Sequence, residues 1–376
     1  QPWVGTMRQY GGFASLGMEI TNYNTPYTFF LTLCSYLQAE PLIPIKIFSV
    51  VFDFLLAVGV ASCVYAVYPK RFLLASAGFV AAILLPTGIL NSAMWAQCDS
   101  VYITFIVWAL WAVLKDKPLL AGILLGFSFA FKLQAVLALP FFALLFLCRK
   151  FCAEGFLGIP LMSCVLSLPA IFAGQKLSII WSVYKGQMEE YSGELNKNAP
   201  SIFAWLQNHE PELLRSVGVW FTIAVLFLVA CYFIWQNKRL NAKAILLLFA
   251  FCSVLTPFLL PNMHERYFYL AGISVLIYAV VVPKHWYLAV MQESISFYTY
   301  LRYFFGINFF NFEWIVFAEF FVLATLGKAL LKEMALLPVW NWQKNFMPKD
   351  MPKEESKTEN SLSDVTNNNI LINKEN

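Results

Sequence analysis

The sequence predicts an all-α integral membrane protein, a bundle of about ten spanning helices. Hydrophobic residues make up 60% of its 376 residues, whereas soluble domains contain about 45–50%. Charged residues make up only 13%, about half the usual share. Several apolar stretches have the length of about 18 residues that indicates a spanning helix. Examples are Ile43–Val67, Phe72–Leu90, Phe156–Gly174 and Val217–Trp235.

Ten of the 26 lysines and arginines lie in short connections between these stretches. They are Lys70-Arg71, Lys115 and Lys117, Arg149-Lys150, Lys238-Arg239 with Lys243, and Lys284. Because basic residues gather in cytoplasmic loops, we expect these connections in the cytoplasm of a multi-pass cell-membrane protein. The net charge of +4 fits such loops and gives no indication of a nucleic-acid partner.

The apolar stretches between the basic connections give the order of the spans. We expect spans at 41–68, 72–90, 101–114, 119–147, 156–174, 213–235, 244–260, 267–282, 286–307 and 314–331. Leu119–Leu147 has basic connections at both ends, so we expect two short helices folded as a hairpin, with a bend near Phe131–Gln134. Tyr27–Leu37 is too short to span and is expected to be re-entrant or interfacial.

Two regions follow from this pattern. Residues 1–335 form the membrane domain, and residues 336–376 form a polar cytoplasmic tail whose composition is typical of disorder. The chain begins with Gln1 in amphipathic sequence. We therefore expect a first span and the start of a first outer loop to precede it.

The remaining polar motifs fall on the outer side of this topology. They are Asn22–Tyr27, Trp95–Ser100, Lys132, Tyr184–Tyr191 and His264-Glu265-Arg266. Charges are costly beside a bilayer, so such a convergence indicates a functional site formed by extracytoplasmic loops. Arg266 and Lys132 suit a phosphate group, and Asp99 could take a proton from a hydroxyl. This set suits sugar transfer from a lipid-linked phosphate, although spacing alone does not establish the reaction.

Four ordered motifs resemble those of a known family. Asn-Tyr-Asn-Thr-Pro-Tyr at 22–27, Trp-Ala-Gln-Cys-Asp-Ser at 95–100, Phe-Lys-Leu-Gln at 131–134 and Met-His-Glu-Arg-Tyr-Phe at 263–268 carry the resemblance. They resemble bacterial membrane mannosyltransferases related to the enzyme that adds the second mannose in GPI-anchor synthesis. That family belongs to the multi-spanning GT-C class. The resemblance covers about residues 1–335.

The resemblance implies inverting transfer from a polyprenyl-phosphate-linked sugar, with mannose expected, to a glycan or glycolipid acceptor. In this class an Asp in the first outer loop usually acts as the base. The first Asp here is Asp53, inside a span, so we expect the base upstream of Gln1 and take Asp99 as the candidate within the chain. The candidate phosphate and substrate residues are His264, Glu265, Arg266, Lys132, Gln134, Asn22, Tyr23, Tyr27, Gln97, Gln187 and Tyr191.

No sequence pattern indicates a cofactor. The chain has no Cys-x-x-Cys pair and no Asp-rich ligand set, and its three His are scattered. These patterns leave open whether the protein binds a divalent metal ion.

Each motif also has a structural interpretation. Asp99 could cap a helix, Lys132 could extend to lipid headgroups, and His264–Arg266 could be a solvated turn. A transporter or flippase for a lipid-linked glycan is the alternative function, because charges along a pathway would serve it too. The sequence shows none of the paired halves that many transporters have.

Overall fold

The computed structural model describes residues 2–189, 194–206 and 210–340. Residues Gln1–Pro338 form one compact unit. Its described elements are helices apart from two strands of two residues each. The predicted all-α fold is therefore confirmed. The predicted polar tail lies, from residue 341 onward, outside the described residues.

Five described helical segments are long and apolar enough to cross a membrane. They are α3 (Leu42–Val67), the broken segment Ala153–Phe172, α13 (Pro211–Gln236), α14 (Ala242–Leu259) and α17 (Phe312–Leu336). A sixth is the pair of Phe72–Ile83 and Pro86–Met94, which form one broken helix with a bend of 44°. The other expected spans coincide with shorter or more polar helices, so the number of about ten stays a prediction.

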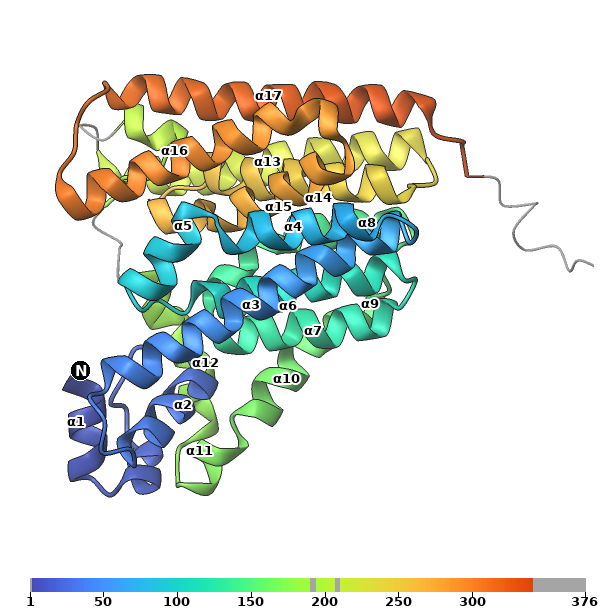
Figure 1. Cartoon of the computed structure of the whole chain (residues 1–376). Helices are drawn as coiled ribbons and strands as arrows, with labels where there is room; N and C mark the ends of the chain where they lie inside the picture. The colour runs from blue at the N-terminus through green and yellow to red at the C-terminus, as the bar shows by residue number, and fades with distance from the viewer. Residues whose placement is uncertain (1, 190–193, 207–209, 341–376) are drawn as a thin grey trace, which may run out of the picture. The chain divides into compact units, whose positions relative to one another are not determined.

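Two sets of packed helices make up the bundle (Figure 1). In the first set, α3 packs against α4 (Phe72–Ile83) and α6 (Asp99–Leu114), and α6 packs against α7 (Pro118–Phe131). In the second, α14 packs against α15 (Tyr269–Val281) and α17, and α15 packs against α16 (Trp286–Phe305). Contacts of α15 with α3 and α4 join the sets. Nearly every described residue of α14 and α15 is buried, so these helices form the centre of the core.

The predicted hairpin within Leu119–Leu147 is confirmed. Helix α7 ends at Phe131, and Lys132 has extended backbone angles of φ −156° and ψ 135°. A 3-10 turn (Leu133–Ala138) then leads into α8 (Leu139–Leu147). The two ends of the segment return to the same side, because the Lys150 ammonium donates to the Asp116 carboxylate at 2.9 Å.

Small residues let the next segment approach α7 closely. The broken segment consists of α9 (Ala153–Phe156), α10 (Gly158–Leu166) and α11 (Leu168–Phe172). A Cβ atom at Gly122 would lie 2.4 Å from the Gly155 Cα, and one at Gly126 would lie 2.0 Å from the Gly158 carbonyl oxygen. Close backbone approach at small residues is a common way for helices to associate in membranes. The Gly122–Gly126 spacing therefore has a packing role that the sequence analysis missed.

Proline shapes the turn that carries the Trp95 motif. Leu85 is extended before Pro86, as expected for a residue that precedes proline, and α5 (Pro86–Ile89) starts the bend. A π-helical turn (Leu90–Met94) follows, and Ala96 has a φ of 60°. This irregular backbone directs Trp95 and Gln97 away from the helical stack and toward the pocket described below.

The first helices form a small layer beside the bundle. They are α1 (Pro2–Gln9), a 3-10 helix (Gly12–Gly17) and α2 (Thr25–Ser35), which pack against one another. The Arg8 guanidinium donates to the carbonyl oxygens of Ser35, Leu37 and Ala39 at 3.2, 2.7 and 3.0 Å. Helix α2 contains residues 27–35 of the predicted stretch Tyr27–Leu37 and, at 11 residues, is too short to span.

Candidate functional site

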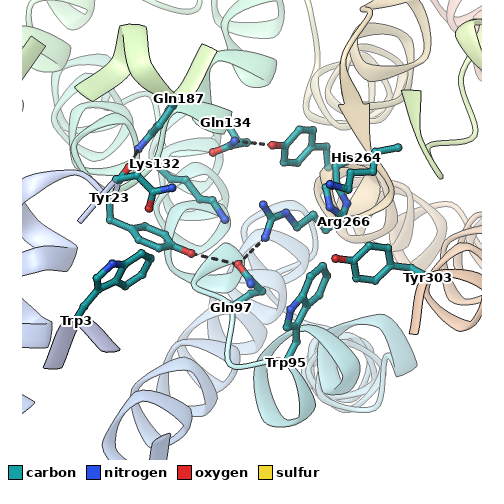
Figure 2. A pocket seen from close by; sticks show the side chains of 13 residues that line it. Trp3, Tyr23, Trp95, Gln97, Lys132, Gln134, Gln187, His264, Arg266 and Tyr303 are labelled. Carbon is teal, nitrogen blue, oxygen red and sulfur yellow. Dashed lines mark hydrogen bonds between the residues drawn. The ribbon is translucent and has the colours of Figure 1, made fainter. Parts of the chain in front are cut away.

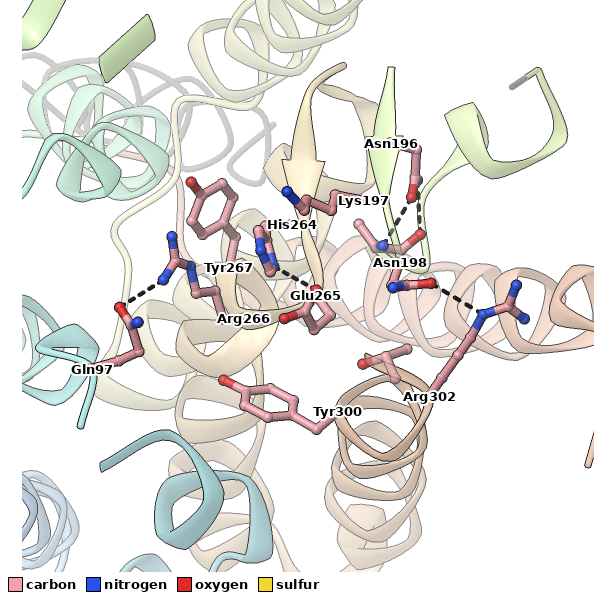
Figure 3. A network of polar contacts seen from close by, with 12 residues as sticks. Gln97, Asn196, Lys197, Asn198, His264, Glu265, Arg266, Tyr267, Tyr300 and Arg302 are labelled. Atoms are coloured by element: carbon pink, nitrogen blue, oxygen red, sulfur yellow. Dashed lines mark hydrogen bonds and ion pairs between the residues drawn. The ribbon is translucent and has the colours of Figure 1, made fainter. Parts of the chain in front are cut away.

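The His264 motif is held by a two-stranded parallel pairing. Strand β2 (Met263–His264) pairs with β1 (Asn196–Lys197), in the long connection that follows α12 (Leu177–Glu189). The backbone N–H of Asn262 donates to the Leu195 carbonyl at 2.8 Å. The Arg302 Nε donates to Asn198 Oδ1 at 3.1 Å (Figure 3). This connection therefore lies beside His264, with Lys197 opposite it in the pairing.

His264 and Glu265 form a buried pair. His264 Nδ1 contacts a carboxyl oxygen of Glu265, and both side chains are almost fully shielded from solvent (Figure 3). Burial raises the pKa of Glu265, and burial together with the charges of Arg266, Lys197 and Lys132 lowers the pKa of His264. Both directions favour the neutral forms near pH 7. The interpretation of this motif as a solvated turn is therefore wrong.

Arg266 is fixed by hydrogen bonding and by stacking. Its Nη1 donates to Gln97 Oε1 at 2.6 Å, and the Tyr23 hydroxyl donates to the same oxygen at 3.4 Å. The Arg266 guanidinium carbon lies 5.2 Å from the ring centre of Trp95 and 5.7 Å from that of Tyr267. An arginine over aromatic rings gains cation–π attraction. The contacts of Arg266 and Gln97 therefore connect three segments that are far apart in the chain.

Lys132 and Asp99 form a second buried pair. The Lys132 ammonium lies 2.5 Å from Asp99 Oδ1, and Asn91 Nδ2 donates to Asp99 Oδ2 at 2.9 Å. Helix α6 begins at Asp99 without a side-chain cap, so the capping interpretation of Asp99 is wrong. The interpretation that Lys132 extends to lipid headgroups is also wrong, because its side chain is 5% exposed and points to Asp99.

These groups meet around one pocket of about 240 Å³ (Figure 2). Eight residues proposed from the sequence line it: Asn22, Tyr23, Gln97, Lys132, Gln134, Gln187, His264 and Arg266. Gln187 Nε2 donates to the Asn22 carbonyl at 2.8 Å, and Gln134 Nε2 donates to the Tyr267 hydroxyl at 2.9 Å. The described lining therefore brings together segments from α1 to α16, and it includes no carboxylate.

Four proposed residues are placed differently. Asp99 and Glu265 are fully buried behind Lys132 and His264 and do not line the pocket. Tyr27 is buried in an aromatic cluster, with its ring centre 4.7 Å from that of Tyr23 and 6.3 Å from that of Phe48. Tyr191 lies outside the described residues.

Five further residues line the pocket and are absent from the candidate phosphate and substrate residues named from the sequence. They are Trp3, Trp95, Lys197, Tyr267 and Tyr303. Trp95 and Tyr267 belong to motifs singled out for their polar neighbours, so weighting the whole motif would have found them. Trp3, Lys197 and Tyr303 carried no local signal, because only tertiary packing brings them to the pocket.

The described residues contain no group of three or more His, Cys, Asp and Glu side chains that could hold a metal ion. The donors that line the pocket are cations, amides, phenols, indoles and one imidazole. The ligand chemistry that they favour is that of an anion with hydroxyl groups.

The fold and the pocket define a polytopic helical membrane protein with a cationic polar pocket. The family model of glycosyltransferase family 87 matches residues 23–261, well over half of the chain, and the chain belongs to that family. The protein is therefore a membrane-associated glycosyltransferase with a sugar donor and an acceptor. The matched region contains Gln97 and Lys132 and ends before His264. A comparison with curated protein sequences gives no match.

Proposed function

We propose that the protein moves a sugar, mannose, from a polyprenyl-phosphate donor to a glycan or glycolipid acceptor. The observation that carries this proposal is the charge of the pocket: Lys132, Lys197 and Arg266 line it from three separate segments, and no carboxylate is among its described lining residues. Such a pocket attracts a phosphate group. Its indole and phenol rings offer flat surfaces to a sugar.

Arg266 is preorganised for phosphate recognition. Gln97 accepts a hydrogen bond from one guanidinium nitrogen, and the guanidinium lies over the rings of Trp95 and Tyr267. The planar fork of a guanidinium is suited to donate to phosphate oxygens. In an inverting displacement the acceptor hydroxyl gives its proton to a base and its oxygen bonds to the anomeric carbon, while the bond from that carbon to the phosphate oxygen breaks. The negative charge that grows on the leaving phosphate is stabilised by fixed donors.

Lys132 and His264 complete this assignment. Asp99 holds the Lys132 ammonium, so we assign Asp99 to positioning Lys132 rather than to contact with the substrate. A neutral Glu265 carboxyl that donates to His264 Nδ1 leaves the proton of the neutral imidazole on Nε2, as a further donor to phosphate. We assign no base among the described lining residues.

The proposed side of transfer is extracytoplasmic. The basic connections gather at the opposite end of the bundle: Arg149 donates to Asn237 at 3.0 Å, Lys150 to Asp116 at 2.9 Å, and Lys238 to the Leu337 carbonyl at 2.9 Å. Because basic loops favour the cytoplasm, the pocket end would face outward and the chain would end inside. The inverting GT-C mechanism and the relation to the GPI-type mannosyltransferases belong to the same proposal.

The test supplies membranes that contain the full chain with radiolabelled polyprenyl-phosphate-mannose, and with labelled nucleotide-mannose in parallel. We expect covalent transfer from the lipid donor alone. Arg266→Ala and Lys132→Ala should abolish transfer, and Arg239→Ala at the opposite end should not change it. Full activity of Arg266→Ala would remove the donor assignment. Movement of label across the membrane without covalent transfer would support the transporter alternative.

A further inference from the structure

A second cationic cavity lies away from the pocket described above. It has a volume of about 410 Å³ and is lined by lysines from three segments: Lys243 in α14, Lys284 in the turn between α15 and α16, and Lys328 and Lys332 in α17. Helix α15 starts beside Arg266 and ends beside this cavity. Its 13 residues span about 20 Å, so the two sites are separate.

The charge of this cavity is not balanced within the described chain. None of the four lysines forms an ion pair there within 4.0 Å. Glu333 is the one acidic residue in the described lining, and its Oε1 accepts from Asn241 Nδ2 at 3.3 Å. Four ammonium groups around one cavity repel one another, and a bound anion relieves this repulsion.

The surroundings of the cavity are those of a membrane interface. Trp286 and Tyr287 directly follow Lys284 and His285, and Trp286 is 63% exposed. Trp and Tyr are enriched at the headgroup level of membrane proteins. His285 Nδ1 and the Tyr278 hydroxyl lie 2.7 Å apart and close one wall of the cavity.

Apolar side chains form the rest of the lining. Leu247, Val282, Ala329 and Leu336 lie in the same cavity as the lysines. An inorganic ion would neutralise the lysines but leave this apolar part without a partner. A phospholipid satisfies both parts, because its phosphate carries the charge and the first methylene groups of its acyl chains are apolar. Basic pockets between spanning helices are known binding places for anionic headgroups.

We propose that this cavity binds the phosphate-bearing headgroup of an anionic membrane lipid. The lipid joins α14, α15 and α17 at the end of the bundle opposite the donor pocket. This site is independent of the proposed sugar donor, and its occupancy does not depend on which sugar the enzyme transfers.

The test measures lipid binding to the full-length protein by native mass spectrometry and by thermal unfolding. The probes are phosphatidylglycerol, phosphatidylcholine and inorganic phosphate. We expect phosphatidylglycerol to bind and to raise the unfolding temperature, and we expect the other two to have little effect. The double variant Lys328→Gln and Lys332→Gln should lower phosphatidylglycerol affinity by about 30-fold.

A matched control keeps the result interpretable. The double variant Lys70→Gln and Lys115→Gln removes the same charge from exposed lysines that do not line the cavity, and it should keep wild-type affinity. Equal losses in the two double variants would show a general charge effect and overturn the proposal. So would equal binding of phosphatidylcholine, or a stabilisation that inorganic phosphate reproduces. If the cavity variant unfolds at the control's temperature in phosphatidylcholine, its loss of affinity is not a folding defect.

Discussion

The Lys132 ammonium lies 2.5 Å from the Asp99 carboxylate, although the two residues are 33 positions apart. Both side chains are buried, and Asn91 occupies the second carboxylate oxygen at 2.9 Å. This pair ties the start of α6 to the break between α7 and α8. The break therefore turns Lys132 to the pocket at the point where Asp99 can hold it.

The first prediction concerns the stability of this pair. Asp99→Asn and Lys132→Met should each lower the free energy of unfolding by about 3–5 kcal/mol, because each leaves one buried charge uncompensated. The double variant should lose much less than the sum, since neither charge remains. Denaturant unfolding in detergent measures this double-mutant cycle. The exposed pair of Lys150 and Asp116 is the control, and Asp116→Asn should cost about 1 kcal/mol or less. Additive losses for Asp99 and Lys132 would contradict the coupling.

The second prediction separates the shape of Arg266 from its charge. Arg266→Lys keeps the charge but loses the planar fork that contacts Gln97 and faces Trp95. We expect the KM for the lipid donor to rise by about tenfold or more, because one charge-assisted hydrogen bond is worth about 1.5–3 kcal/mol. Initial-rate kinetics in membranes measure it, with Arg239→Lys as the control. An unchanged KM would show that charge alone suffices at this position.

The third prediction concerns pH and Glu265. Burial raises the pKa of Glu265 from 4.5 to about 8, so the folded protein keeps this proton in a range where the unfolded chain loses it. The stabilising contribution is complete below pH 4.5 and is lost as the pH rises to about 8. The pKa of His264 is lowered from 6.5, so His264 acts in the opposite direction and only as the pH falls below that value.

The window between pH 6.5 and about 8 therefore lies above the titration of His264 and still contains that of Glu265. Across it the free energy of unfolding should fall more steeply in the wild type than in Glu265→Gln, because the variant lacks this one titration. Denaturant titrations at the two ends of the window measure the difference. Glu212→Gln, at an exposed residue of α13, should follow the wild type. A Glu265→Gln variant with the wild-type slope would place the titration elsewhere.

The fourth prediction tests the connection that carries Lys197. Asn198 has a φ of 54°, a left-handed conformation that favours glycine and asparagine, and its Oδ1 accepts from Arg302. Asn198→Gly keeps the conformation and loses the hydrogen bond, whereas Asn198→Ala loses both. We expect the alanine variant to be the less stable by about 1 kcal/mol and to have the weaker donor affinity. Equal behaviour of the two variants would mean that backbone conformation has no part in holding this segment.

Much of the fold was predictable because a bilayer imposes simple rules. Apolar length marked the spans, and the basic connections at both ends of Leu119–Leu147 required a hairpin, which the Lys150–Asp116 contact confirms. The same rules could not find the Gly122 and Gly155 contact, because it depends on the rotation of two helices about their axes.

The site was predictable where polar residues interrupt apolar sequence, as at Gln97, Lys132 and His264. Sequence reasoning did not separate lining from supporting residues. Asp99 and Glu265 are as polar as their partners, but they lie one layer behind them. Lys197 gave no signal, since the parallel pairing with His264 joins segments far apart in the chain.

The last prediction concerns which side of the membrane the pocket faces. Lys185 lies on α12, whose Gln187 lines the pocket, and Lys115 lies at the end of α6 with the basic connections; both side chains are exposed. In intact cells an impermeant thiol reagent should label Lys185→Cys, and it should label Lys115→Cys only after the cells are opened. The wild-type chain, with its own cysteines, gives the background. The reverse pattern would place the pocket in the cytoplasm, where a donor presented on the outer side could not reach Arg266 or Lys132.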